Sequence, residues 1–184
     1  MAKSNTKGTN FLVQGSILAI ASIISRIIGL IYRIPMTAII GDVGNNYYAA
    51  AFDIYNVMLI ISSYSLPLAV SKLVSAKMAK GQFKTAYQVL KGALLFALVS
   101  GTIVAVIVFF GAGFFTKTLL STPNSIFALR VLAPALVIVA VLGVIRGFFQ
   151  GLGTMMPSAV SQIIEQVVNA IVSVWAAYVL YRVG

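Results

Sequence analysis

The sequence contains no cysteine and no histidine, and its only carboxylates are Asp42, Asp53 and Glu165. Without thiols or imidazoles, the chain can form no disulfide and none of the usual zinc, haem or iron–sulfur sites. Three carboxylates are too few for a cation cage made only of protein ligands. We therefore expect neither a metal site nor a cofactor.

Two phosphate-binding motifs are also missing. No glycine is followed directly by a lysine, which excludes the GxxxxGK[ST] loop, and Gly111-Ala-Gly113 continues into an apolar run instead of completing GxGxxG. Since nucleophilic thiols and imidazole bases are absent too, we predict that the chain is not an enzyme.

Charge is scarce throughout. Only 9% of the residues are charged and 60% are hydrophobic, whereas a soluble domain has about 25% charged residues. This composition predicts a polytopic membrane protein with membrane lipids as its surroundings. The net charge of +10 comes from basic residues scattered among apolar runs, so it indicates a membrane surface or an anionic ligand within the membrane. We do not expect a nucleic-acid partner.

Apolar runs dominate what is present. A membrane-spanning helix needs about 20 mostly apolar residues, and the pattern predicts a single all-α transmembrane domain over residues 1–184. Its five predicted spans cover residues 11–40, 47–71, 88–115, 126–150 and 157–181. Pro35 and Pro67 lie inside the first two spans and predict kinks there, and a Lys-rich cytoplasmic linker is expected at 72–87.

Lysines are concentrated after the second span, at positions 72, 77, 80, 84 and 91. The positive-inside bias then places the N-terminus and this segment in the cytoplasm. Lys77, Lys80, Lys84 and Lys91 share one helical face. They could form a surface helix on anionic lipid, or serve only as a topology determinant on a solvated face.

The first span carries a polar stripe formed by Ser22, Arg26, Gly29 and Arg33. An arginine near mid-membrane costs about 2.5–3.5 kcal/mol on insertion scales, so it requires a water-filled cavity or a partner. Because a guanidinium binds phosphate bidentately, one interpretation is a cavity wall that receives a phosphate or pyrophosphate. The alternative is snorkelling or internal ion pairing.

Depth within the membrane suggests one such pair. Arg33 and Asp53 are each expected about two turns below the outer surface, where they could form an ion pair. Asp53 and Asn56 together give the second span a polar edge. If the Arg33–Asp53 pair is structural, Arg26 is the freer cation.

The fifth predicted span carries a second polar stripe, consisting of Ser158, Gln162, Glu165, Asn169 and Ser173. At membrane depth such a face must look into the bundle or a wet cavity. Glu165 could be a proton or cation site, or it could brace a basic residue such as Arg146.

The fourth predicted span ends in Gly143, Gly147 and Gly151. This spacing lets another helix backbone approach closely. It predicts helix packing, with a flexible gate as the alternative.

Two stretches carry a family resemblance. They are Ser-Arg-Ile-Ile-Gly-Leu-Ile-Tyr-Arg-Ile-Pro at 25–35 and Arg-Gly-Phe-Phe-Gln-Gly-Leu-Gly-Thr-Met-Met-Pro-Ser-Ala-Val-Ser-Gln-Ile-Ile-Glu-Gln-Val-Val-Asn at 146–169. With these stretches the chain resembles the MurJ/SpoVB/YtgP lipid II flippases, bacterial polysaccharide-precursor exporters of the MOP transporter superfamily. The resemblance implies a fold of two helical lobes around a cavity. This chain would supply most of the N-terminal lobe, and we expect it to be a fragment that lacks the C-terminal lobe as its partner.

The resemblance also implies a function. It predicts a flippase of the bacterial cytoplasmic membrane for a lipid-linked sugar pyrophosphate, the undecaprenyl-pyrophosphate-linked peptidoglycan precursor, working by alternating access. Arg26 matches the family's Ser-Arg-x-x-Gly position, and Arg33 matches the next arginine with one residue of extra spacing. Asn45 and Asn46 stand where relatives have an acidic residue, and Leu59 where they have an arginine. The alternatives are a cation-coupled multidrug exporter and a non-transporting membrane scaffold.

Overall fold

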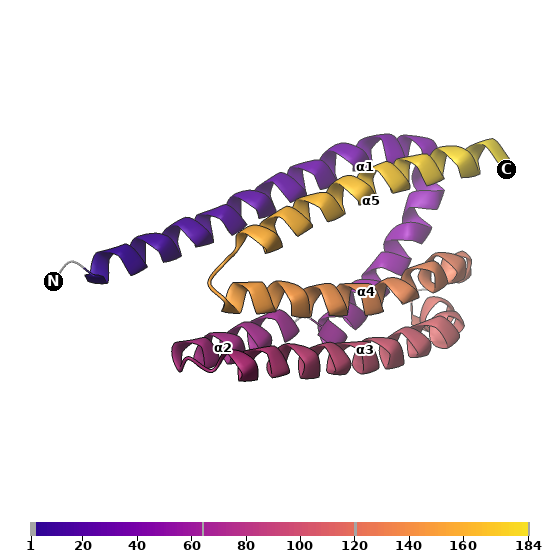
Figure 1. Cartoon of the computed structure of the whole chain (residues 1–184). Coiled ribbons are helices and arrows are strands. Elements are labelled where there is room, and N and C mark those ends of the chain that lie inside the picture. Colours follow the sequence, from indigo (N-terminus) through magenta and orange to yellow (C-terminus); the bar gives the residue numbers. More distant parts are fainter. Residues whose placement is uncertain (1–2, 64, 120, 184) are drawn as a thin grey trace. The chain divides into compact units, whose positions relative to one another are not determined.

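The computed structural model describes residues 3–63, 65–119 and 121–183, with side chains described over 13–62, 65–118, 121–175 and at 178. The described residues are almost entirely helical and contain no strand, which confirms the predicted all-α polytopic bundle (Figure 1). The elements are α1 (Lys3–Ser63), α2 (Leu66–Ala79), α3 (Phe83–Phe114), the π-helical turn η1 (Phe115–Leu119), the 3₁₀ turn η2 (Pro123–Ser125), α4 (Ile126–Gly151) and α5 (Met156–Val183).

Helix α1 contains two helices joined at a single residue. Gly41 has φ 72° and ψ 175°, a conformation outside the helical region and favourable only for glycine. The expected loop at 41–46 is therefore reduced to this break, and residues 42–46 are helical. Pro35 lies within the first half of α1, whereas the non-helical backbone angles occur at Gly41.

The second predicted span, 47–71, differs from the structure because helix α1 ends at Ser63 and a new helix begins at Leu66. Pro67 stands in the first turn of α2. Proline is favourable there, since the first N–H groups of a helix have no intrahelical acceptor. The sequence pattern predicts a kink at Pro67, and the structure instead has a helix start.

The Lys-rich stretch at 72–87, expected as a linker between spans, is helical over most of its length. Helix α2 continues to Ala79 and α3 begins at Phe83, so only residues 80–82 form the turn. Lysines are good helix formers, and charge alone does not end a helix. The turn comes at Gly81, whose φ of 69° allows the reversal.

Three segments of the described residues are long and apolar enough to cross a membrane, namely Val13–Ala79, Phe83–Thr118 and Pro123–Gly151. The first includes the Gly41 break and holds both of the first two predicted spans. That α5 crosses the membrane stays a prediction.

Internal contacts divide the chain into two compact units. Unit 1 comprises Met1–Val43 and Gly153–Gly184, and unit 2 comprises Gly44–Leu152. Unit 1 thus contains the first half of α1 and all of α5, and unit 2 contains the second half of α1 with α2, α3 and α4.

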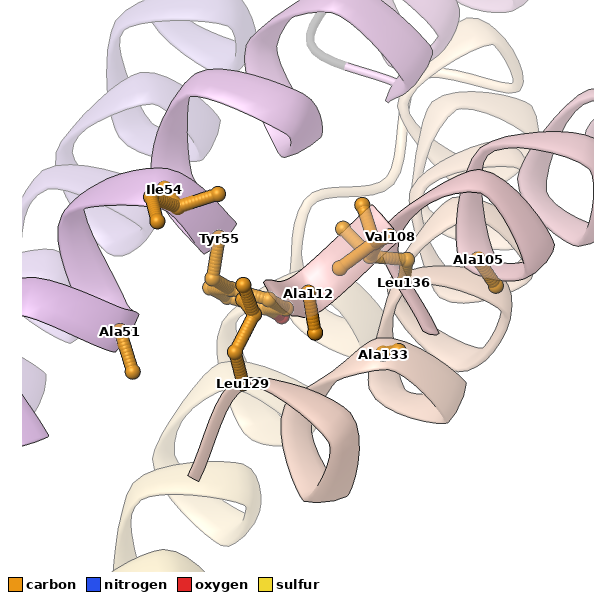
Figure 2. Close-up of a cluster of buried hydrophobic side chains, with 9 residues drawn as sticks. All are labelled: Ala51, Ile54, Tyr55, Ala105, Val108, Ala112, Leu129, Ala133 and Leu136. Atoms are coloured by element: carbon orange, nitrogen blue, oxygen red, sulfur yellow. The ribbon is translucent and has the colours of Figure 1, made fainter. Parts of the chain in front are cut away.

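Unit 2 has a core in which the second half of α1 packs with α3 and α4 (Figure 2). Its buried members are Ala51, Ile54, Tyr55, Ala105, Val108, Ala112, Leu129, Ala133 and Leu136. A second buried cluster joins α2 to α3 and α4 through Val70, Val74, Ala86, Ala97, Ala140 and Val144. Many of these residues are small, which lets helix backbones approach closely where lipid supplies no hydrophobic driving force.

Candidate functional site

In unit 1, the first half of α1 and α5 lie side by side and run in the same direction (Figure 1). Two polar contacts join them: Ser22 Oγ lies 3.4 Å from Gln162 Oε1, and Asn169 Nδ2 donates to Tyr32 Oη (3.2 Å). A third lies directly before α5, where the Met155 N–H donates to Gln14 Oε1 (2.8 Å). The residue numbers rise together on both helices across these contacts, as parallel helices require. This helix pair is the frame of the predicted site.

The polar stripe of α5 supplies much of this pairing. Gln162 and Asn169 contact α1, and Ser173 Oγ donates to Asn169 Oδ1 at 3.1 Å. Ser158 is buried, and its carbonyl accepts a hydrogen bond from Ser161 Oγ at 2.9 Å. In a membrane, hydrogen bonds between helices replace the hydrogen bonds that water would provide to these polar groups in solution. Part of the stripe therefore serves to hold the two helices together.

We call the line of contacts between α1 and α5 the seam, and Ser22 lies on its α1 side. Its Oγ lies 2.9 Å from the Leu18 carbonyl oxygen as well as near Gln162. Ser25, one turn further along, is buried and its Oγ has no hydrogen-bond partner in the described structure. The pattern in the sequence identifies Ser22 but misses Gln14, Ser25 and Tyr32, because they lie off the arginine stripe.

Both arginines of α1 lie beside the seam with exposed side chains. The buried face of this helix includes Ala21, Ser25 and Met36. A helix turns about 100° per residue, so Arg26, directly after Ser25, stands at the edge of that face. Arg33, seven residues further along, points in nearly the same direction. The two guanidinium groups therefore share one flank of the helix pair.

Glu165 lies on the same flank as Arg26. From the contacting Ser22 and Gln162, a step of four residues leads to Arg26, and a step of three leads to Glu165. Viewed down its own helix axis, Arg26 is rotated by about +40° from Ser22, and Glu165 by about −60° from Gln162. Because the two helices are parallel and face each other, rotations of opposite sign bring both side chains to the same side of the pair. Both residues lie about one turn beyond the Ser22–Gln162 contact. Glu165 is half-buried, and the flank carries more arginine than carboxylate.

Three other predicted site residues involve unit 2. Asp53 is exposed and Asn56 half-buried on the second half of α1, and Arg146 lies on α4. The Arg33–Asp53 pair and the Glu165–Arg146 brace each join residues of different units. Both stay predictions.

The glycine ridge of α4 packs against α2 within unit 2. A Cβ built on Gly147 would lie 2.8 Å from the Pro67 Cα and meet the Pro67 carbonyl, and one on Gly151 would lie 2.7 Å from Val74 Cβ. At Gly143 the nearest atom, Pro67 Cγ, would be 3.2 Å away. Contacts under 3.0 Å do not occur for real Cβ atoms, so Gly147 and Gly151 allow this approach. The glycine spacing can be recognised in the sequence, but the contact of these glycines with Pro67 cannot be predicted from it.

Within the described residues there is no group of three or more His, Cys, Asp or Glu side chains that could hold a metal ion. The polar groups beside the α1–α5 contacts include the guanidinium groups of Arg26 and Arg33, the carboxylate of Glu165 and a series of hydroxyl and amide groups. Such a set can bind an anion.

Comparison with known proteins identifies the chain's relatives. The model of the family described as polysaccharide biosynthesis protein matches residues 11–183. The chain belongs to this family. The match includes α5 and both resembling stretches, so the resemblance seen in the sequence is confirmed. No solved structure matches the chain.

Curated relatives come from Bacillus subtilis (strain 168). The lipid II flippase MurJ is 32% identical over 181 residues, covering 94% of this chain and 33% of the relative. Stage V sporulation protein B is 31% identical over 159 residues, covering 86% of this chain and 31% of the relative. The membrane protein YabM is 28% identical over 178 residues, covering 95% and 32%. The chain thus spans about a third of the length of these family members. Its relatives and its apolar helices make it a membrane protein.

Proposed function

We propose that this chain forms part of a flippase that exports an undecaprenyl-pyrophosphate-linked peptidoglycan precursor, lipid II, across the bacterial cytoplasmic membrane. The proposal is supported by family membership and by a relative named as a lipid II flippase. Transport would proceed by alternating access, with the lipid tail remaining in the bilayer. The N-terminus would lie in the cytoplasm.

The observation that carries the proposal is the arginine flank of unit 1. Arg26 and Arg33 are exposed and lie seven residues apart on α1, so their side chains leave the helix in nearly the same direction. A guanidinium offers planar donors that match phosphate oxygens bidentately. Two of them about two turns apart suit an elongated anion such as a pyrophosphate carrying a sugar.

The direction of the helix pair supports the expected topology. If α1 begins in the cytoplasm and α5 runs parallel to it, the chain must return to the cytoplasm between them. An odd number of intervening crossings achieves this. In the proposed five-span arrangement, residues 44–79, α3 and α4 would be these three crossings.

The scaffold alternative relies on the glycine ridge of α4 as a surface for another protein. Within unit 2 that ridge is already covered, since Gly147 and Gly151 contact α2. This close contact weighs against the scaffold and leaves the transporter interpretation ahead.

The test is complementation of flippase-depleted bacteria by the full-length natural parent and by this 184-residue chain. We expect rescue by the parent alone, because this chain spans only about a third of the length of the curated relatives it matches. If neither rescues despite good membrane expression, lipid II export is wrong, and export of another polymer precursor or of cationic drugs takes its place.

Arg26→Ala in the parent should abolish rescue while membrane abundance stays normal, because the pyrophosphate loses its bidentate partner. Arg26→Lys should rescue only weakly, since an ammonium group acts as a point charge. Arg130→Ala is the matched control: Arg130 is an exposed arginine of α4 that lies over the Phe109 ring, and its removal should leave rescue intact. Normal growth with Arg26→Ala would refute the assigned role.

A further inference from the structure

One charged surface of unit 2 has no part in the proposed transport step. We define the lysine surface as the side chains of Lys72, Lys77, Lys80, Lys84 and Lys91, which lie around the turn between α2 and α3. All are exposed except Lys77, which is half-buried. Helix α2, the turn and the first turns of α3 therefore carry five lysines.

The turn itself holds part of this surface in place. The N–H groups of Lys80 and Gln82 both donate to the Lys77 carbonyl, at 3.2 and 3.0 Å, and the Gly81 N–H donates to the Met78 carbonyl at 3.0 Å. These bonds cap α2 and lead directly into α3. As a result Lys77, Lys80 and Lys84 are kept within a few turns of one another despite their like charges.

Exposed aromatic side chains accompany the lysines on α3. Phe83 is 65% exposed and Tyr87 is 55% exposed, and Lys91 Nζ lies 5.0 Å from the centre of the Tyr87 ring. Lys84, Tyr87 and Lys91 are spaced by three and four residues, so they share one face. Aromatic residues of this kind favour the membrane–water boundary. This combination of residues is therefore suited to the headgroup level of a membrane.

Carboxylates do not neutralise this surface within unit 2. The only acidic residue of that unit is Asp53, and its neighbours Ala51 and Ile54 pack in the cluster that contains Ala105. Ala105 and Lys84 are 21 residues apart on α3, or about 31 Å along the helix. The Debye length in physiological salt is about 8 Å, so Asp53 leaves the lysine charges uncompensated.

We propose that the lysine surface binds the headgroups of anionic phospholipids in the adjoining leaflet. Five ammonium groups that no carboxylate of unit 2 compensates are complementary to phosphate and phosphatidylglycerol headgroups, and each basic residue near an anionic surface contributes about 1 kcal/mol. The neighbouring aromatic rings and the apolar α3 beyond them favour a lipid as the occupant over a soluble anion. The surface then selects the lipids that surround this end of unit 2. This inference does not depend on the substrate proposed above.

The test uses the absence of cysteine from the chain. Gln88, which is exposed and lies between Lys84 and Lys91 in the sequence, is replaced by cysteine and labelled with a bimane fluorophore in the otherwise unchanged full chain. The protein is reconstituted in vesicles that contain brominated phosphatidylglycerol or brominated phosphatidylcholine at equal mole fractions. Quenching then reports which lipid occupies this surface. We expect phosphatidylglycerol to bind at least about threefold more tightly, and the preference to fall at about 1 M salt.

Two variants sharpen the test. Lys84→Gln with Lys91→Gln should remove most of the preference, whereas Lys84→Arg with Lys91→Arg should keep it. The matched control, Lys117→Gln with Arg130→Gln, removes the same charge at the other end of α3 and should also keep it. Equal quenching by the two lipids in the unchanged protein, or a preference that survives Lys84→Gln with Lys91→Gln, would overturn the proposal. Displacement of phosphatidylglycerol by added polyprenyl pyrophosphate would assign the surface to the transported substrate instead, and so would also overturn it.

Discussion

Some polar residues of unit 1 form contacts between α1 and α5, whereas others have exposed side chains beside those contacts. Gln162 and Asn169 contact Ser22 and Tyr32 across the helix pair. Arg26 and Arg33 stand beside that seam with exposed side chains. The α1 stripe thus contains Ser22, which contacts α5, and two arginines with exposed side chains, for which anion binding is the proposed role.

The Tyr32–Asn169 hydrogen bond offers a direct measure of the seam. Tyr32→Phe and Asn169→Val, made singly and together, should give a coupling of about 0.6 kcal/mol in the free energy of unfolding, since bonds between membrane helices average that value. Reversible unfolding in detergent micelles measures it. Val160→Ala with Tyr32→Phe is the control pair, because Val160 is an exposed α5 residue near the other end of the seam and should show no coupling. A zero coupling for Tyr32 and Asn169 would mean that the bond adds nothing.

Spacing within one helix identified some of the residues that lie at helix contacts, whereas their role in a site stays a prediction. The α1 and α5 stripes lie on parallel helices joined by hydrogen bonds, and the glycine spacing of α4 marks a real close approach. Partners far along the chain could not be predicted, because periodicity within one helix does not reveal which helix lies opposite. Tyr32 and Pro67 were missed for this reason.

At the scale of elements, the helix ends depend on single glycines and prolines. Gly41 breaks α1, Pro67 opens α2, and Gly81 turns α2 into α3. The linker expected at 72–87 is largely helical because its lysines tolerate a helix. Composition therefore predicts helical segments well but places their ends less accurately, since an end depends on local backbone angles and capping.

Gly147→Ala should weaken the packing of α4 on α2. The added Cβ would collide with the backbone of Pro67, which cannot rotate away as a flexible side chain would. We expect a loss of about 1–3 kcal/mol in the free energy of unfolding, as for other overpacked sites. Thermal or denaturant unfolding in micelles measures the loss.

Gly92→Ala is the matched control for this substitution. Gly92 is a helical glycine of α3, and no atom of a neighbouring element lies within 4 Å of the place where an alanine Cβ would stand. Alanine there should be neutral or stabilising by up to about 1 kcal/mol, because it lowers the backbone entropy of the unfolded chain. Equal stability of the Gly147→Ala and Gly92→Ala proteins would show that the α2–α4 contact is not tight in solution.

For the molecule as a whole, the distribution of lysines and the direction of the helices bear on two parts of the proposed topology. The parallel α1 and α5 require an odd number of crossings between them, which places their first residues on the same side of the membrane. The lysine surface at the turn between α2 and α3 favours the cytoplasm for that turn, and with it the proposed cytoplasmic N-terminus.

Single-cysteine labelling checks this orientation in cells. Gln82→Cys lies in the turn after α2 and Thr118→Cys lies in η1, and both positions are exposed. An impermeant maleimide should label Thr118→Cys in intact cells, and Gln82→Cys only after lysis, because the positive-inside bias retains the lysine-rich turn in the cytoplasm. Labelling of Gln82→Cys in intact cells would reverse the assigned topology.

The sequence by itself determined the class of this protein. Sixty per cent hydrophobic residues and three carboxylates define a membrane helix bundle, because burial in lipid depends on composition and on periodicity along one helix. Only the tertiary structure decided that Gln162 contacts Ser22 and that Asn169 contacts Tyr32. It also decided that Gly147 packs against Pro67. Those contacts join residues about 80 to 140 positions apart, and such pairings arise from shape and hydrogen bonding between helices that no local pattern records.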